Sequence, residues 1–236
     1  MTYLAIKKEL LKKADKKKAL VLRGFFKTGK GEYGEGDKFL GVLVPEQRKI
    51  ARQYVELNLE EVQKLLKSAW HEERMTALLI ILYKFNKEKN ENERKKVFDF
   101  YLKNTRYINN WDLVDVTCRD IVGGYLFDKN RAVLYKLVKS KNLWERRIAI
   151  VSTFYFIMRG EIKDVLSLSE ILSADPHDLI HKATGWMLRE TGKRCSRDVL
   201  ISFLKKHYKK MPKVMFRYAT EKLSTKEKDS IKQGWG

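Results

Sequence analysis

Proline and strand-like patterns are scarce in this chain. Its 236 residues include three prolines, and few segments alternate apolar with polar residues as strands do. Apolar residues instead recur at helical spacing along nearly the whole length. The sequence therefore predicts an all-α protein.

Cysteines and long apolar runs are scarce as well. Two cysteines, Cys118 and Cys195, do not make a disulfide framework. No apolar run has the roughly 20 residues of a membrane-spanning helix, and the lysine-rich N-terminus lacks the apolar core of a signal peptide. We therefore expect a cytoplasmic protein without membrane contact.

Acidic residues are too few to balance the basic ones. Fifty Lys and Arg stand against 30 Asp and Glu, which gives a formal charge of +20 and a pI near 9.8. Such an excess favours a polyanionic partner, most simply nucleic acid, which would place the protein at the nucleoid. A lysine-biased surface that is simply solvated is the alternative.

Familiar catalytic and cofactor motifs are missing or incomplete. Residues 29–34 match G-x-G-x-x-G, but no strand precedes them and two glutamates would repel phosphate. His177 and His181 have a spacing that suits a metal, yet no further ligand completes a site. No serine-hydrolase pattern is present. We expect no metal and no organic cofactor.

Helical periodicity divides the chain into short, closely connected helices. Residues 28–38, rich in glycine, read as a surface loop. A single domain is expected over residues 1–225, followed by a polar tail, 226–236, that frays. Helices are expected over residues 3–13, 17–27, 45–57, 60–70, 72–87, 91–103, 110–127, 129–140, 144–159, 161–173, 177–191, 196–209 and 212–223.

A repeat of about 36 residues runs through these helices. The alanines that mark it are separated by 72, 34 and 36 residues, and the midpoint of the first gap is Leu113. Such a period in a helical chain predicts stacked helix pairs, a HEAT-like solenoid whose equivalent helices line one concave face. The alanines and the basic residues before them are Arg74 and Ala77, Arg146, Arg147 and Ala149, Lys182 and Ala183, and Arg217 and Ala219.

The central repeat departs from this basic pattern. Its helix begins with Trp111 and Asp112 instead of Arg or Lys. Asn110 is a suitable N-cap, so Trp111 opens the helix and Asp115 lies one turn on along the same face. An indole face attracts a cation, and a carboxylate stabilises it or orients a water. This pair suits a flat cationic substrate; a core Trp with capping or solvated acids is the alternative.

Two further helices carry candidate residues. Trp186 starts the equivalent helix two repeats on, next to Gly185, which permits the close approach of a backbone or a ligand. Arg146 and Arg147 lie near a helix start, where phosphates bind. The alternatives are a core Trp with a packing glycine, and a solvated basic face.

Four stretches together resemble the AlkD-type DNA alkylation repair family, the HEAT-like repeat DNA glycosylases. They are GEYGEGDKFLGVLVPEQRKIAR (31–52), NNWDLVDV (109–116), LWERRIAI (143–150) and LIHKATGWMLRE (179–190), in the family's order and spacing. The resemblance covers residues from about 20 to 220. It implies a curved right-handed solenoid whose basic concave face holds duplex DNA, and the excision of N3- and N7-alkylated purines.

The resemblance also assigns roles to residues. Trp111 and Trp186 would flank the lesion nucleotide, and Asp115 would stabilise the oxocarbenium-like sugar and position the attacking water. Arg147 would hold a phosphate beside the lesion, and Arg48 would contact the backbone. The remaining residues that we expect to bind DNA are Phe25, where some members carry a Tyr, and Arg146, Lys182 and Arg189.

The expected activity is that of a monofunctional alkylpurine DNA glycosylase, a monomer acting on double-stranded DNA. Two other functions stay open. The chain could be a non-catalytic relative that recognises damaged or bent duplex, or a helical-repeat scaffold for an acidic protein partner. Base release separates the first two functions, and a steep salt dependence of DNA binding separates both from the third.

Overall fold

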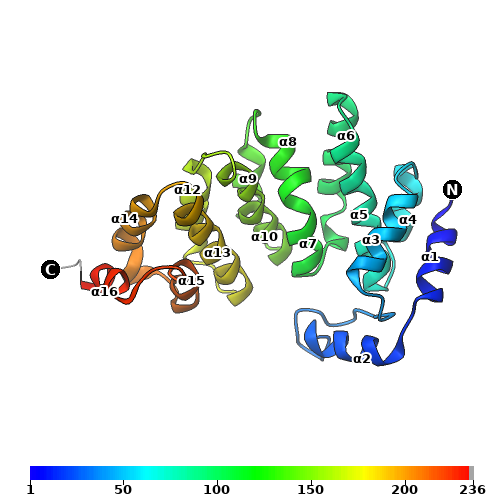
Figure 1. Cartoon of the computed structure of the whole chain (residues 1–236), viewed down its shortest axis with the longest axis horizontal. Coiled ribbons are helices and arrows are strands. Elements are labelled where there is room, and N and C mark those ends of the chain that lie inside the picture. Colours follow the sequence, from blue (N-terminus) through cyan, green and yellow to red (C-terminus); the bar gives the residue numbers. More distant parts are fainter. Residues whose placement is uncertain (234–236) are drawn as a thin grey trace. The chain divides into compact units, whose positions relative to one another are not determined.

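The computed structural model describes residues 1–233, and helices make up most of this part of the chain (Figure 1). Two compact units divide it, Met1–Ile121 and a second unit that begins at Val122. Within the described range no strand forms, although Lys38 and Trp70 pair in an isolated parallel bridge. The prediction of an all-α protein is confirmed. No helix between residues 1 and 233 is both long and apolar enough to cross a membrane.

The first unit is built around α5. Every residue of this helix from His71 to Leu82 is buried, and α1, α3, α4, α6 and α7 pack against it (Figure 1). The helices of this unit are α1 (Tyr3–Lys12), α2 (Lys16–Phe25), α3 (Val44–Gln53), α4 (Leu59–Leu66), α5 (His71–Lys87), α6 (Glu91–Lys103), the 3-10 turn η1 (Thr105–Tyr107) and α7 (Trp111–Cys118).

The second unit is built around α13, against which α10, α11, α12, α14 and α15 pack. Gly185 lets α15 approach closely, because a Cβ there would lie 2.5 Å from the Met215 carbonyl oxygen. The helices of this unit are α8 (Gly124–Leu126), α9 (Ala132–Leu137), α10 (Leu143–Ser152), α11 (Phe154–Ile157), α12 (Lys163–Leu172), α13 (Asp178–Arg194), α14 (Arg197–His207), the 3-10 turn η3 (Tyr208–Lys210), α15 (Lys213–Ala219) and α16 (Thr225–Gln233).

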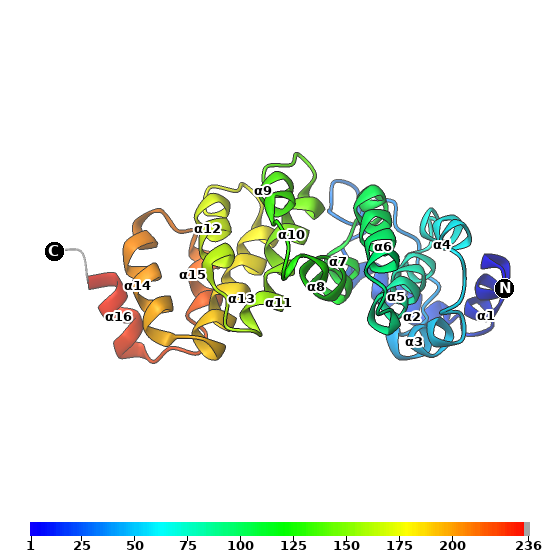
Figure 2. The ribbon, with the colours of Figure 1, turned by 90° about the horizontal axis from the view of Figure 1, so that it is seen from above.

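Most predicted helix ends differ from the structure by one to four residues, and three predicted segments differ more. The helix expected over 110–127 widens into the π-turn η2 (Arg119–Gly123), and the one expected over 144–159 divides into α10 and α11. Residues 226–233, expected to fray, form α16 together with Thr225, and this helix lies beside α14 (Figure 2). Fully buried Ile231 joins the core of Leu204 and Met215, and this burial explains why the helix forms. Trp235 lies outside the described residues.

The positions that mark the period near 36 residues lie on five different helices. Within the second unit, α10 packs on α13 and α13 on α15, in chain order. The marked positions are all buried: Ala77 on α5, Leu113 on α7, Ala149 on α10, Ala183 on α13 and Ala219 on α15.

Candidate functional site

The start of α7 has the predicted geometry. Asn110 is the N-cap, and its side-chain oxygen accepts a hydrogen bond of 2.9 Å from the Trp111 amide. Trp111 and Asp115 are both half-buried, one helical turn apart. An indole and a carboxylate therefore follow one another along α7, as the N-cap position predicts.

Two phenylalanines from the end of α2 pack on this indole. The Phe26 ring is stacked on the Trp111 ring with centroids 5.4 Å apart, and the Phe25 ring meets it edge-on at 5.8 Å. Phe26 is buried, whereas 60% of Phe25 is exposed. Trp111 is therefore not a core residue. Aromatic packing fixes its indole ring, and part of the side chain remains accessible.

The glycine-rich loop (residues 28–38) and the segment after it are held by a buried carboxylate. Glu72 on α5 is 1% exposed and accepts hydrogen bonds from the amides of Leu40, Gly41 and Val42, at 2.7 to 3.3 Å. Gly41 has a φ of 85° and lies against the Asp15 carbonyl, so a side chain does not fit there. This anchoring places Asp37 and Phe39 next to α5.

A buried cluster of charges joins the loop, α5 and α7. The two ring nitrogens of His71 face Asp37 Oδ2 at 3.2 Å and Asp112 Oδ2 at 2.8 Å. Arg74 Nη2 lies 2.7 Å from Asp37 Oδ1, and Asn109 donates to the same oxygen at 3.3 Å. Asp112 is therefore part of a buried ion network, in addition to lying in the first turn, where the sequence places it.

The cluster changes the pKa values of its members. Burial opposes the charged imidazole, but Asp112 and Asp37 outweigh it and raise the pKa of His71 above the ordinary 6.5. Burial also opposes ionisation of Asp37, but His71, Arg74 and Asn109 outweigh it and lower the pKa of Asp37. Both shifts favour an imidazolium between two carboxylates.

The buried phenol of Tyr101 on α6 supports α7 near Asp115. The Tyr101 hydroxyl lies 3.0 Å from Thr117 Oγ1. Burial raises the pKa of Tyr101 well above 10, and the charges of Cys118 and Asp115 act in the same direction. The phenol therefore stays neutral beside the carboxylate that we expect to carry the chemistry.

Arg48 lies on α3 in the same unit. Its Nη1 donates to the Tyr83 hydroxyl on α5 at 3.2 Å, and part of the side chain is exposed. The guanidinium is thus oriented by a neutral partner, which leaves its charge available to a phosphate.

The second predicted tryptophan belongs to the second unit. Trp186 lies on α13, half-buried, with its ring 5.8 Å from the Phe154 ring at an angle of 57°. Neighbouring Gly185 faces α15 and serves helix packing, which was one of its two interpretations.

The predicted DNA-binding cations of this unit are engaged within it. Arg147 is 6% exposed, and its Nη1 donates to the Leu179 carbonyl at 2.6 Å. The three other cations lie in ion pairs with nearby carboxylates. These pairs are Arg146 with Asp175, Lys182 with Asp178, and Arg189 with Glu221 and Glu190. The structure thus groups Phe25, Trp111, Asp115 and Arg48 in one unit, and Trp186 with these four cations in the other.

Sequence patterns do not reveal the buried cluster. One signal was present: four consecutive polar residues, His71 to Arg74, open a helix that is otherwise apolar, and all four are buried. The other histidine pair has structural roles. His177 Nδ1 accepts from the Leu179 amide, and His181 Nε2 lies 2.6 Å from the Asp175 carbonyl. No cluster suited to a metal ion occurs among residues 1–233.

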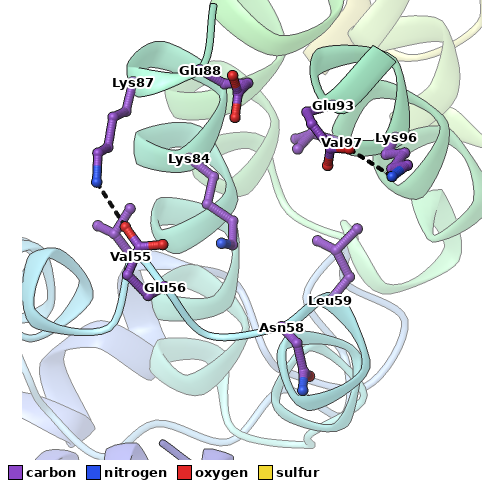
Figure 3. A pocket seen from close by; sticks show the side chains of 10 residues that line it. All are labelled: Val55, Glu56, Asn58, Leu59, Lys84, Lys87, Glu88, Glu93, Lys96 and Val97. Carbon is purple, nitrogen blue, oxygen red and sulfur yellow. Dashed lines mark hydrogen bonds and ion pairs between the residues drawn. The ribbon is translucent and has the colours of Figure 1, made fainter. Parts of the chain in front are cut away.

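A cavity of about 470 Å³ lies elsewhere in the first unit (Figure 3). Its charged lining is balanced, and none of the predicted site residues takes part in it. It is therefore not the candidate site. The lining consists of Val55, Glu56, Asn58, Leu59, Lys84, Lys87, Glu88, Glu93, Lys96 and Val97.

Comparison with known proteins agrees with the resemblance in the sequence. A family model described as DNA alkylation repair enzyme matches residues 6–223. A solved structure, described as a predicted DNA alkylation repair enzyme from Enterococcus faecalis, is similar with a TM-score of 0.70 and 16% sequence identity. The similarity covers 90% of this chain and 98% of that one, and at this identity it shows a common fold. No curated protein matches the sequence.

Proposed function

Because the chain belongs to the DNA alkylation repair enzyme family, we propose that it is a DNA glycosylase acting on N3- and N7-alkylated purines in duplex DNA. The observation that carries this proposal is the start of α7, where an accessible indole and a carboxylate lie on successive turns. Exposed Phe25 extends the aromatic surface beside Trp111.

The reaction requires stabilisation of positive charge on the sugar. An alkylated purine is cationic and leaves as a neutral base, taking the electron pair of the broken C1′–N bond. The Asp115 carboxylate stabilises the oxocarbenium-like sugar and orients a water, which adds to C1′ and loses its proton to the carboxylate or to solvent. Loss of one such preorganised group typically lowers the rate about 10²–10³-fold.

Aromatic and basic residues bind the substrate in this proposal. The indoles of Trp111 and Trp186 attract the cationic nucleotide, each contributing about 0.5–2 kcal/mol. Arg48 holds a backbone phosphate. Arg147 is 6% exposed and donates to the Leu179 carbonyl, so it holds a phosphate only by leaving that partner. A phosphate must compete with carboxylates for the remaining cations, so they contribute less than Arg48; they are Arg146, Lys182 and Arg189.

We also propose that residues 1–225 form one right-handed HEAT-like solenoid with a basic concave face. Three observations support it: the period near 36 residues, the packing of α10, α13 and α15 in chain order, and the formal charge of +20. The occupant of that face would be the phosphate backbone of duplex DNA.

The decisive experiment is single-turnover release of N7-methylguanine from duplex DNA. Asp115→Asn keeps the shape of the side chain and removes its charge, so we expect intact DNA binding and a rate at least about 10²-fold lower. Asp99→Asn is the matched control, because Asp99 on α6 is exposed and paired with Lys95. A wild-type rate in Asp115→Asn would refute the proposal.

The same assay separates the other two functions. Salt-sensitive duplex binding without release of N3- or N7-alkylated bases, including bulky adducts, would identify a non-catalytic binder. Weak binding with little salt dependence would instead favour a scaffold for an acidic protein.

A further inference from the structure

His71 is buried next to the start of α7, which carries the candidate site. It is 2% exposed, at the first position of α5, between the glycine-rich loop and α7. We propose that His71 is a positioning residue: its imidazolium clamps the first turn of α7 to the loop and thereby fixes Trp111 and Asp115. The reaction that this clamp serves rests on the function proposed above.

The hydrogen-bond geometry favours a charged ring. Nδ1 lies 3.2 Å from Asp37 Oδ2, and Nε2 lies 2.8 Å from Asp112 Oδ2. A neutral imidazole has one N–H, so its other nitrogen would point a lone pair at a carboxylate oxygen. An imidazolium donates to both carboxylates at once, and these come from segments 75 residues apart in the sequence.

Ring stacking connects the same imidazole to the indole. Phe39 and Phe26 lie on the His71 ring, with centroids 4.7 Å and 4.9 Å away. Phe26 in turn stacks on Trp111 at 5.4 Å. His71 therefore reaches α7 by two routes, the hydrogen bond to Asp112 and the stack through Phe26, so a shift of His71 is transmitted to Trp111.

The charges around His71 balance only when the ring is protonated. Arg74 on α5 and the imidazolium supply two positive charges, against Asp37 from the loop and Asp112 from α7. Deprotonation leaves two buried carboxylates facing one guanidinium, which is costly in a dry environment. The neighbouring acids on α5 are occupied elsewhere, because Glu72 binds the loop amides and Glu73 pairs with Lys7 of α1.

This arrangement makes the site depend on one proton. When His71 loses its proton, the contact between the loop and α7 loosens, and Trp111 and Asp115 lose their fixed placement. The rate of base release should then fall by up to about tenfold for each pH unit above the His71 pKa. A purely structural histidine would lower stability without moving the upper limb of the pH–rate profile.

Nuclear magnetic resonance without DNA tests the clamp directly. The chain has four histidines and five tryptophans, so ¹⁵N labelling of both residue types resolves the imidazole and indole signals. His71→Gln identifies the His71 signal, and Trp111→Phe identifies the Trp111 indole. We expect the Trp111 indole signal to shift with the same midpoint as the His71 imidazole, above pH 6.5.

Asp112→Asn and a control complete the experiment. Asp112→Asn removes one carboxylate, so it should move both the NMR midpoint of His71 and the upper limb of the pH–rate profile to lower pH. This variant tests the clamp even if His71→Gln does not fold. His207→Gln is the control, because His207 also lies beside a carboxylate, Glu170 at 3.1 Å, but in the second unit. It should change neither midpoint.

The outcomes separate the clamp from the proposed activity. The clamp is refuted if the Trp111 indole signal does not change as His71 titrates. It is also refuted if the His71 midpoint in Asp112→Asn equals that of wild type. Base release that stays constant through the His71 titration overturns it too. Absence of base release under all conditions refutes the glycosylase, while the NMR titration still decides the clamp.

Discussion

Glu72→Gln is the substitution whose effect follows most directly from the structure. The carboxylate is 1% exposed and binds three consecutive amides, at 2.9 Å to Leu40, 2.7 Å to Gly41 and 3.3 Å to Val42. Glutamine has nearly the same shape, but it carries one oxygen and replaces the other with an amide that donates. With the glutamine oxygen in the place of Oε1, all three N–H groups keep an acceptor, because Oε1 also accepts from Leu40 at 3.0 Å. The new NH₂ then takes the place of Oε2 and faces the Leu40 N–H, donor against donor.

The expected cost follows from these contacts. A hydrogen bond to a charged group contributes roughly 1.5–3 kcal/mol against about 0.5–1.5 kcal/mol for a neutral one, so each retained bond weakens by about 1 kcal/mol. The buried NH₂ that faces the Leu40 N–H costs a further 1–3 kcal/mol or so, because neither group can accept. With three weakened bonds, the free energy of unfolding of the first unit should therefore fall by about 4–6 kcal/mol.

Urea denaturation monitored by circular dichroism measures this loss. Glu73→Gln is the control, because Glu73 is equally buried but forms its ion pair with half-exposed Lys7, and we expect a loss below about 1 kcal/mol. If the loop detaches before the unit unfolds, trypsin should cut sooner at Lys27 and Lys30 in Glu72→Gln. A variant as stable and as protease-resistant as wild type would refute the assigned role of Glu72.

Two further predictions concern helix packing and pH. Gly185→Ala should lower the stability of the second unit by about 1–3 kcal/mol in urea denaturation, because the new Cβ would overlap the Met215 carbonyl. Gly24→Ala is the control: nothing lies within 4 Å of its new Cβ, so stability should stay unchanged or rise by about 0.5–1 kcal/mol. A larger loss in Gly24→Ala than in Gly185→Ala would contradict the packing role of Gly185. The raised pKa of His71 stabilises the first unit below pH 6.5, and this contribution should be lost as pH rises through the folded-state pKa. The lowered pKa of Asp37 stabilises it above pH 3.8, and this contribution should be lost as pH falls through its folded-state pKa. Denaturation from pH 3 to 9 should show both losses in wild type and lack the upper one in His71→Gln.

Residues close together in the sequence account for much of what could be predicted. The start of α7 follows from Asn110 and the apolar run after it, and the spacing of Trp111 and Asp115 on one helix places them on successive turns. These features depend on helix geometry, which operates over three to four residues.

Tertiary burial decides what happens at the C-terminus. Residues 226–233 have a polar composition that predicts fraying, yet α16 forms because Ile231 is fully buried against the core of the second unit. A short helix is only marginally stable alone, so the packing of one apolar residue outweighs the local composition.

The surroundings of the candidate site were decided by contacts between distant residues. Phe25 meets Trp111 across 86 positions, and His71 meets Asp37 and Asp112 across 34 and 41. Helical periodicity carries no information at such separations, and it treats a charged residue at a helix start as solvated. Local sequence therefore decides which residues α7 presents, whereas long-range burial of the charged cluster decides how firmly they are held.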